Sequence, residues 1–342
     1  MTDPHHTHDI APDSDALAAL EARAYAAFDQ GQLQQASALF GELAGHAPHV
    51  SYLHYMRGLA HKYLRDWPAS LQHNLHAQAL QPQLDEGAAW NAGIAATALG
   101  DWAEARRQWA HCGITLPEGD GPVERDFGMI GVRLNPWGDG ETVFARRIDV
   151  VRARLLNVPL PESGHRLFDI VLHDGAKTGE RALDDGVVPV FNALQILERS
   201  DHRTFVAFIR CPSADDLDTL QAAELPGIGY VEDWTASIVP LCLRCSYGVG
   251  HVHGDGDSAH EDDAASNDDW QIERTLGIGA QGKAAVERLL ADWVAAGPGR
   301  GVDAIECPAC EETAPEDGTV WWRDVTDVQD EDEDAGADDA SA

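Results

Sequence analysis

A repeat of 34 to 35 residues in the first third of the chain constrains the fold more than any other feature. Pro48, Pro82 and Pro117 follow one another at separations of 34 and 35 residues, and each closes a unit of two helical stretches. Small residues are needed where two helices cross closely, and aromatic residues fill the space beside them. The spacing therefore predicts a stack of helix pairs.

Matching positions of the units carry the same kinds of residue. A turn glycine, a small residue and an aromatic residue recur in the first and third units, as Gly31, Ala36 and Phe40 and as Gly100, Ala105 and Trp109, with Gly93 preceding them in the third. This pattern resembles the tetratricopeptide repeat (TPR) family over about residues 17–118. The middle unit keeps Gly58 and Ala77 but has Arg65, Ser70 and Asn74 at the turn, small and aromatic positions. An ordinary helical bundle is the alternative.

The resemblance implies a concave groove, lined by the first helix of each repeat, that receives an extended peptide or a partner helix. Helical periodicity assigns nine residues to the groove: Tyr25, Phe28, Tyr52, Tyr55, Leu59, Lys62, Trp90, Asn91 and Ile94. Enrichment in Tyr and Trp is typical of binding hot spots. The set of Lys, Arg and Asn by which some TPR domains clamp a C-terminal carboxylate is missing, which disfavours a chaperone-tail receptor. Packing between repeats is the alternative role for any single side chain.

After Pro117 the sequence changes from Ala-rich helices to short β-rich stretches separated by Gly, Pro and Asp. Five strands are predicted, over Thr142–Ile148, Leu167–His173, Val187–Phe191, Thr204–Arg210 and Ile228–Trp234. Between the last two, Ser213 can cap a helix with acidic residues in its first turn. Strand, helix and strand in succession predict a βαβ unit and an α+β domain.

The fold class we expect is an α superhelix of three TPR helix pairs followed by an α+β domain with a structural zinc site. The expected domain boundaries are a disordered N-terminus over 1–15, the TPR domain over 16–118, the α+β domain over 121–322 with an acidic loop at 254–269, and a disordered acidic tail over 323–342.

Two Cys-x-x-Cys pairs, Cys242 with Cys245 and Cys307 with Cys310, carry the clearest chemistry of the chain. Two thiolates three positions apart can hold one ion from a tight turn, and a second pair completes the tetrahedral sulfur shell that Zn²⁺ favours. Gly248 behind the first pair resembles the knuckle of zinc-ribbon proteins. We therefore predict one structural Zn²⁺ that joins the ends of the long insertion between the pairs.

Two other interpretations of the cysteines stay open. His251 and His253 could replace the second pair as ligands, although two histidines separated by a single residue would strain the coordination shell of one ion. A redox-active Cys-x-x-Cys usually lies at a helix N-terminus beside a strand, and neither pair has that context in the sequence.

A glycine-rich segment at 277–284 matches the dinucleotide fingerprint and most of a phosphate loop. Gly277, Gly279, Gly282 and Lys283 are the candidate cofactor-binding residues. Ala284 stands where a phosphate loop needs Ser or Thr for Mg²⁺. A nucleotide-binding enzyme is therefore an alternative function, and a flexible approach to a helix starting near Lys283 is the simpler interpretation.

The net charge of −34, from 58 acidic and 24 basic residues, excludes a general nucleic-acid binder, because such affinity rests on Lys and Arg. Residues 254–269 hold seven acids and residues 311–342 hold thirteen, so the charge is concentrated in two segments. The sequence has no apolar run of the 18 or more residues that a membrane span needs. We therefore expect no membrane partner. Cysteine pairs of this type suit a reducing compartment, so we also expect a cytoplasmic protein.

These observations together predict a protein-protein interaction module that binds rather than catalyses. A third hypothesis is an acidic inhibitor or immunity-type protein that neutralises a basic partner, since opposite fields speed encounter. The sequence leaves the identity of the partner and the oligomeric state open.

Overall fold

In the computed structural model the chain divides into two units, which are described separately. The first comprises Met1–Gly121 and Glu316–Val320, and the second comprises Pro122–Pro315 and Trp321–Ala342. The structure describes residues 14–81, 83, 85–138, 140–183, 186–238, 270–309, 311, 314–315 and 317. The predicted acidic loop at 254–269 and the predicted disordered tail lie outside the described residues. Most of the predicted N-terminal disordered segment does too, and the first helix begins at Ser14.

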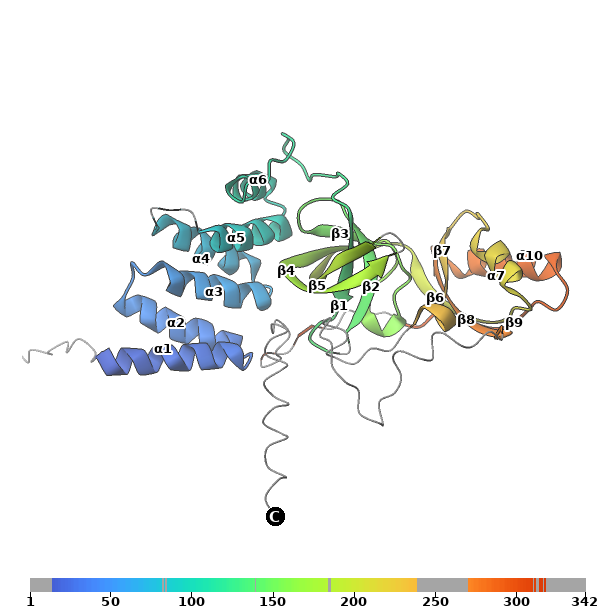
Figure 1. Ribbon diagram of the computed structural model, residues 1–342, viewed down its shortest axis with the longest axis horizontal. Coiled ribbons are helices and arrows are strands. Elements are labelled where there is room, and N and C mark those ends of the chain that lie inside the picture. The colour runs from blue at the N-terminus through green and yellow to red at the C-terminus, as the bar shows by residue number, and fades with distance from the viewer. Residues whose placement is uncertain are drawn as a thin grey trace, which may run out of the picture. The chain divides into compact units, whose positions relative to one another are not determined.

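Six helices follow one another in the described part of the first unit. They are α1 (Ser14–Asp29), α2 (Leu33–His46), α3 (Ser51–Tyr63), α4 (Trp67–Ala79), α5 (Glu86–Leu99) and α6 (Trp102–His111). Each helix packs against the next, which gives three stacked helix pairs (Figure 1). The predicted helical repeats are therefore confirmed.

Close helix crossings explain the repeated glycines. A Cβ atom added to Gly93 of α5 would lie 2.7 Å from the ring of Trp109 in α6. A Cβ atom at Gly58 of α3 would lie 2.5 Å from the side chain of Asn74 in α4. Both distances are shorter than van der Waals contact, so these crossings require glycine.

The middle repeat keeps the geometry of its neighbours with different residues. Arg65 has a φ of 59°, close to the 77° of Gly31 and the 71° of Gly100 at the equivalent turns. Ser70 Oγ donates to the carbonyl of Gly58 at 2.9 Å, and Asn74 is fully buried. A hydrogen bond across the crossing thus replaces the aromatic contact that the first and third repeats use.

Aspartates cap the last three helices of this unit. Each side chain accepts a hydrogen bond from a backbone N–H of the first turn, namely Asp66 from Ala69, Asp85 from Ala88 and Asp101 from Glu104. Such caps satisfy N–H groups that have no partner inside the helix.

The second unit begins with a closed five-stranded barrel. Its strands are β1 (Met129–Leu134), β2 (Glu141–Arg147), β3 (Arg152–Leu155), β4 (Ile170–Leu183) and β5 (Gly186–Glu198). Neighbours in sequence pair antiparallel, and β1 closes the barrel by pairing parallel with β5. Ile130, Val132, Val143, Leu155 and Val171 lie in its buried core.

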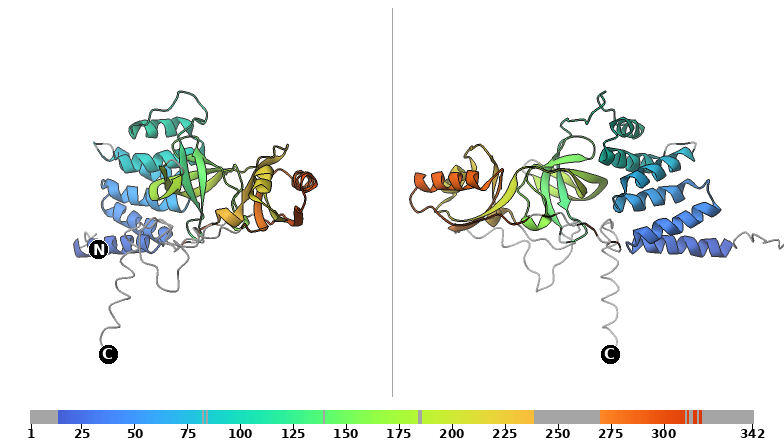
Figure 2. Two further views of the ribbon diagram at one scale, coloured as in Figure 1. Left: turned by 45° about the vertical axis from the view of Figure 1, so that its right-hand side comes forward. Right: turned by 180° about the vertical axis from the view of Figure 1, so that it is seen from behind.

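A four-stranded sheet with two longer helices, α7 and α10, and one short helix follows the barrel. The elements are β6 (Arg203–Arg210), α7 (Ala214–Gln221), β7 (Ile228–Asp233), the short α8 (Trp234–Ser237), β8 (Glu273–Ala280), α10 (Lys283–Ala296) and β9 (Gly301–Glu306). The strand order is β7-β8-β6-β9 with antiparallel neighbours, which is the split β-α-β arrangement. Leu217 of α7 and Leu290 of α10 join Phe205 and Ile278 in one core, so both helices cover the same face (Figure 2).

The predicted strands match β2, β6 and β7 closely, and the predicted βαβ unit is β6-α7-β7. The strand predicted over Val187–Phe191 covers only the first part of β5, which runs on to Glu198. The prediction of a strand over Leu167–His173 is wrong in its bounds, because Phe168 has a φ of 67° and β4 begins only at Ile170. Four strands, β1, β3, β8 and β9, were not predicted. Among the described residues, none of the helices combines the length and the hydrophobicity of a transmembrane span.

Candidate functional site

The nine residues predicted to line the groove fall into three groups by exposure. Tyr25 and Tyr52 are exposed; Tyr55, Leu59 and Trp90 are half-buried; Phe28, Lys62, Asn91 and Ile94 are buried. The buried group fits the alternative that side chains of this stripe fill the space between repeats. The exposed tyrosines lie on α1 and α3, the first helices of consecutive repeats.

Specific contacts hold the two exposed tyrosines. Tyr25 is 38% exposed, and its ring meets that of Phe40 edge-on at a centroid distance of 5.2 Å. Tyr52 is 39% exposed, and its hydroxyl donates to Glu21 Oε1 at 2.5 Å, which links α3 to α1. Rings held in this way lose little conformational entropy when a partner binds.

Partial burial, aided by acidic neighbours, keeps both hydroxyls protonated. Partial burial, followed by the hydrogen bond and the charge of Glu21, raises the pKa of Tyr52 to about 12. Partial burial, followed by the charges of Glu21 and Asp29, raises the pKa of Tyr25. At neutral pH both side chains are therefore neutral hydrogen-bond donors.

The half-buried aromatic residues continue this surface toward the third repeat. Tyr55 lies against Gly87 at the start of α5, where an added Cβ would be 3.4 Å from the Tyr55 ring. Trp90 packs edge-on against Trp109 at 5.2 Å. Both rings are therefore in contact with the helix pair of the third repeat.

A cluster of four histidines between α3 and α4 was not predicted. The rings of His54 and His76 lie 4.2 Å apart, those of His61 and His73 lie 5.5 Å apart, and those of His54 and His73 lie 6.5 Å apart. The spacing of His54 and His61 by seven residues on α3, and of His73 and His76 by three on α4, is the signal that could have revealed it. Arg57 lies beside them on α3, where its charge acts on three of the rings.

The cluster favours neutral imidazoles. Burial, followed by the charge of Arg57 and the neighbouring histidines, lowers the pKa of His73 to about 4. Burial is also the main cause that lowers the pKa values of His54 and His61, although Asp66 opposes the shift at His61. Within the described ranges, no three His, Cys, Asp or Glu side chains are placed to hold a metal ion together.

Of the four predicted zinc ligands, the structure describes only Cys307. It directly follows β9, is half-buried, packs against the core of the sheet and forms no disulfide. Cys242, Cys245 and Cys310 lie outside the described residues, as do His251 and His253. The zinc site therefore stays a prediction.

The glycine-rich segment does not form a phosphate-binding loop. Gly277 and Gly279 lie inside β8, a central strand, and Gly282 precedes α10 at Lys283. A Cβ at Gly277 would lie 2.2 Å from the ring of Trp234, and a Cβ at Gly279 would lie 2.4 Å from the side chain of Leu167. These two glycines admit large apolar side chains onto the sheet face, which leaves no space there for a phosphate. The prediction of a flexible approach to a helix is therefore wrong for Gly277 and Gly279, which lie in a strand, whereas the predicted helix start near Lys283 is confirmed by α10.

The basic residues around β2 and β3 are mostly paired within the chain. Arg152 is buried and bonds Asp149 at 2.5 Å, and its Nη2 donates to the carbonyl of Val123 at 2.7 Å. Arg146 forms an ion pair with Asp126. Arg152 is therefore not available to an anionic partner, whereas the pair of Arg146 and Asp126 is exposed and adds little stability.

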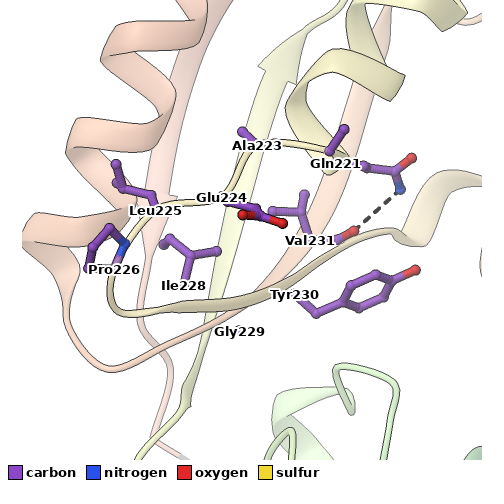
Figure 3. A pocket seen from close by; sticks show the side chains of 10 residues that line it. Gln221, Ala223, Glu224, Leu225, Pro226, Ile228, Gly229, Tyr230 and Val231 are labelled. Carbon is purple, nitrogen blue, oxygen red and sulfur yellow. Dashed lines mark hydrogen bonds between the residues drawn. The ribbon is translucent and has the colours of Figure 1, made fainter.

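A pocket of about 590 Å³ lies between the end of α7 and the edge strand β7 (Figure 3). Residues 221–226 and 228–231 line it, and Gln221 Nε2 donates to the carbonyl of Val231 at 3.3 Å. Glu224, which is exposed, is the one charged residue of the lining that the structure describes. Tyr230 also lines the pocket, and burial raises the pKa of its hydroxyl. The described lining holds no His, Cys, Lys or Asp side chain.

A second pocket, of about 520 Å³, contains Ser200, Asp201 and His202, the residue types of a hydrolytic triad. Ser200 Oγ and Asp201 Oδ1 both lie near the same ring atom, His202 Nδ1, at 3.3 and 3.0 Å. A triad needs the nucleophile and the carboxylate on different nitrogens of the imidazole. This geometry therefore does not support nucleophilic catalysis.

No protein-family model matches the chain, and no curated protein matches it. Among solved structures it is similar to the first TPR of Spaghetti (RPAP3) bound to HSP90 peptide SRMEEVD, with 22% sequence identity and a TM-score of 0.28. The match covers 30% of this chain and 80% of that one.

Proposed function

We propose that the helical repeats are a TPR-type interaction module that binds a peptide or a partner helix along the first helices of the repeats. The observation that carries the proposal is the pair of exposed tyrosines, Tyr25 and Tyr52, each fixed by a contact to a neighbouring helix. Large amphipathic rings that are already ordered are the residues on which binding energy concentrates. Tyr55 and Trp90 extend the same aromatic surface.

Affinity retention of a partner from a lysate tests this proposal. The wild-type chain is compared with Tyr25→Ala and Tyr52→Ala, and with Gln35→Ala as a control on the exposed side of α2. We expect both tyrosine variants to lose the same partner, since removal of a hot-spot residue costs about 2 kcal/mol or more, and the control to retain it. Retention of every partner by both tyrosine variants would exclude this surface.

We also propose a structural Zn²⁺ held by Cys242, Cys245, Cys307 and Cys310. A free, half-buried Cys307 immediately after β9 suits a site that fixes the end of the sheet. Metal analysis of protein purified under reducing, chelator-free conditions is expected to give about one Zn per chain, and Cys307→Ser is expected to destabilise the second unit alone. Protein without zinc would remove the proposal. We further propose a cytoplasmic location, because the free thiols of Cys112, Cys211 and Cys307 fit a reducing compartment.

A further inference from the structure

The exposed face of α1 carries an alternation of acidic and aromatic side chains. Glu21, Tyr25 and Asp29 follow one another at four-residue intervals, so they share one face of the helix. Tyr52 of α3 joins this row through its hydrogen bond to Glu21. We propose that these four residues, the acidic tyrosine patch, receive an arginine side chain of the bound peptide. The inference rests on the proposed peptide-binding function and names the chemistry of the peptide.

The four side chains lie close enough to act on one ligand group. Glu21 contacts Tyr52 directly, and the charges of Glu21 and Asp29 both act on the Tyr25 hydroxyl. Tyr25 in turn acts on Tyr52. The patch therefore combines two carboxylates with two exposed aromatic rings, across two consecutive repeats.

The negative charge of the patch is not compensated by basic residues that the structure describes. Neither Glu21 nor Asp29 forms an ion pair with a described residue, and no described Lys or Arg contributes to the pKa shift of either tyrosine. Arg23 lies two residues from Glu21, which places it about 200° around the helix from that side chain. A cation from a partner would thus meet carboxylates that are not already neutralised.

Arginine matches this combination better than lysine. Its planar guanidinium can stack on a tyrosine ring while its fork of N–H groups bonds a carboxylate. Lysine offers a compact point charge that cannot form both contacts with the same geometry. An acidic peptide is repelled by the same two carboxylates.

Selection from a displayed library of random twelve-residue linear peptides on the full chain tests the inference. Selected peptides are then synthesised, and their dissociation constants are measured by fluorescence anisotropy. The test variant is Glu21→Gln with Asp29→Asn, which removes both charges but keeps the shapes. The matched control is Glu118→Gln with Asp120→Asn, which removes two exposed charges beyond α6.

We expect selected peptides to be enriched in arginine relative to the library and to bind the test variant about tenfold more weakly than the wild type and the control. Replacement of the peptide arginine by lysine is expected to weaken binding to the wild type. Selected peptides that show no arginine preference, or that bind the test variant as tightly as the control, would overturn the arginine site and leave peptide binding intact. A library that yields no binder would overturn both.

Discussion

Acidification is expected to loosen the helical repeats through the histidine cluster, and His73 allows the magnitude to be worked out. Burial holds the folded-state pKa of His73 at about 4, against 6.5 in the unfolded chain. The unfolded state therefore binds more protons below pH 6.5, so the stabilisation is complete above that pH and is lost as the pH falls toward 4. Between pH 7.5 and 5.0 this single group accounts for a loss of about 2 kcal/mol before solvent screening, and about 1 kcal/mol after it.

The charged and titratable neighbours of His73 lower its pKa, as burial does. Arg57 on α3 opposes any added positive charge, and His54 and His61 also have lowered pKa values. Asp66, which faces His61 at 3.1 Å, is the one described carboxylate in contact with the cluster, and it partly offsets the loss. The total for the cluster is therefore expected to exceed that for His73 alone.

Hydrogen exchange of the full chain, followed by mass spectrometry and corrected for intrinsic rates, measures this loss locally. Protection of α3 and α4 is expected to fall between pH 7.5 and 5.0, and to fall less in His73→Gln. His49→Gln, at an exposed histidine outside the cluster, is the control and is expected to behave like the wild type. Equal losses of protection in His73→Gln and the wild type would refute the reasoning.

Three further changes test the packing of the chain. Gly279→Ala is expected to cost about 1–3 kcal/mol in thermal or urea unfolding, because its Cβ would lie 2.4 Å from Leu167; an unchanged midpoint would contradict this contact. Arg152→Met is expected to cost about 3–5 kcal/mol in urea unfolding, because it leaves the buried carboxylate of Asp149 without its ion-pair partner. The double variant Asp149→Asn with Arg152→Met removes this unpaired charge and is expected to lose less; an equal loss would contradict the explanation. Asp101→Ala, which removes the cap of α6, is expected to lower the free energy of unfolding in urea by about 1 kcal/mol, and an unchanged free energy would show that the cap adds nothing.

The helical repeats could be predicted because their signal is local. The crossing glycines, the turn glycines and the small residues recur at fixed intervals, and they perform in the structure the packing role that their type implies. The middle repeat shows the limit of this signal. Arg65 takes the left-handed turn conformation without being glycine, and Ser70 with Asn74 replaces an apolar crossing by hydrogen bonds. The middle repeat could still be predicted because its helices keep the repeat interval, although the residue types at the turn and the crossing differ.

The sheet-rich unit was harder to predict because its pairing is not local. Gly277 and Gly279 are typical of a loop when only the sequence is read, yet they lie in a central strand against Trp234 and Leu167. The need for glycine comes from side chains more than forty residues away. The parallel closure of β1 on β5 likewise joins segments that no short-range pattern connects.

The nine predicted groove residues stay a prediction, but their burial in the structure divides them. Helical periodicity placed nine residues on one stripe, but it cannot separate the side chains that pack between repeats, such as Ile94, from those that reach solvent, such as Tyr52. The histidine cluster was missed because its members lie on two helices. Only the packing of α3 on α4 brings their rings together.

Site-specific photo-cross-linking tests the central claim, that the tyrosine surface binds a partner, most directly. A benzophenone amino acid is placed at position 52, and at position 35 as the control on α2, in the full chain. The account predicts a cross-linked partner from position 52 that is absent from position 35 and is lost when Tyr25 is also changed to Ala. Equal cross-linking from both positions, or none from position 52, would contradict it.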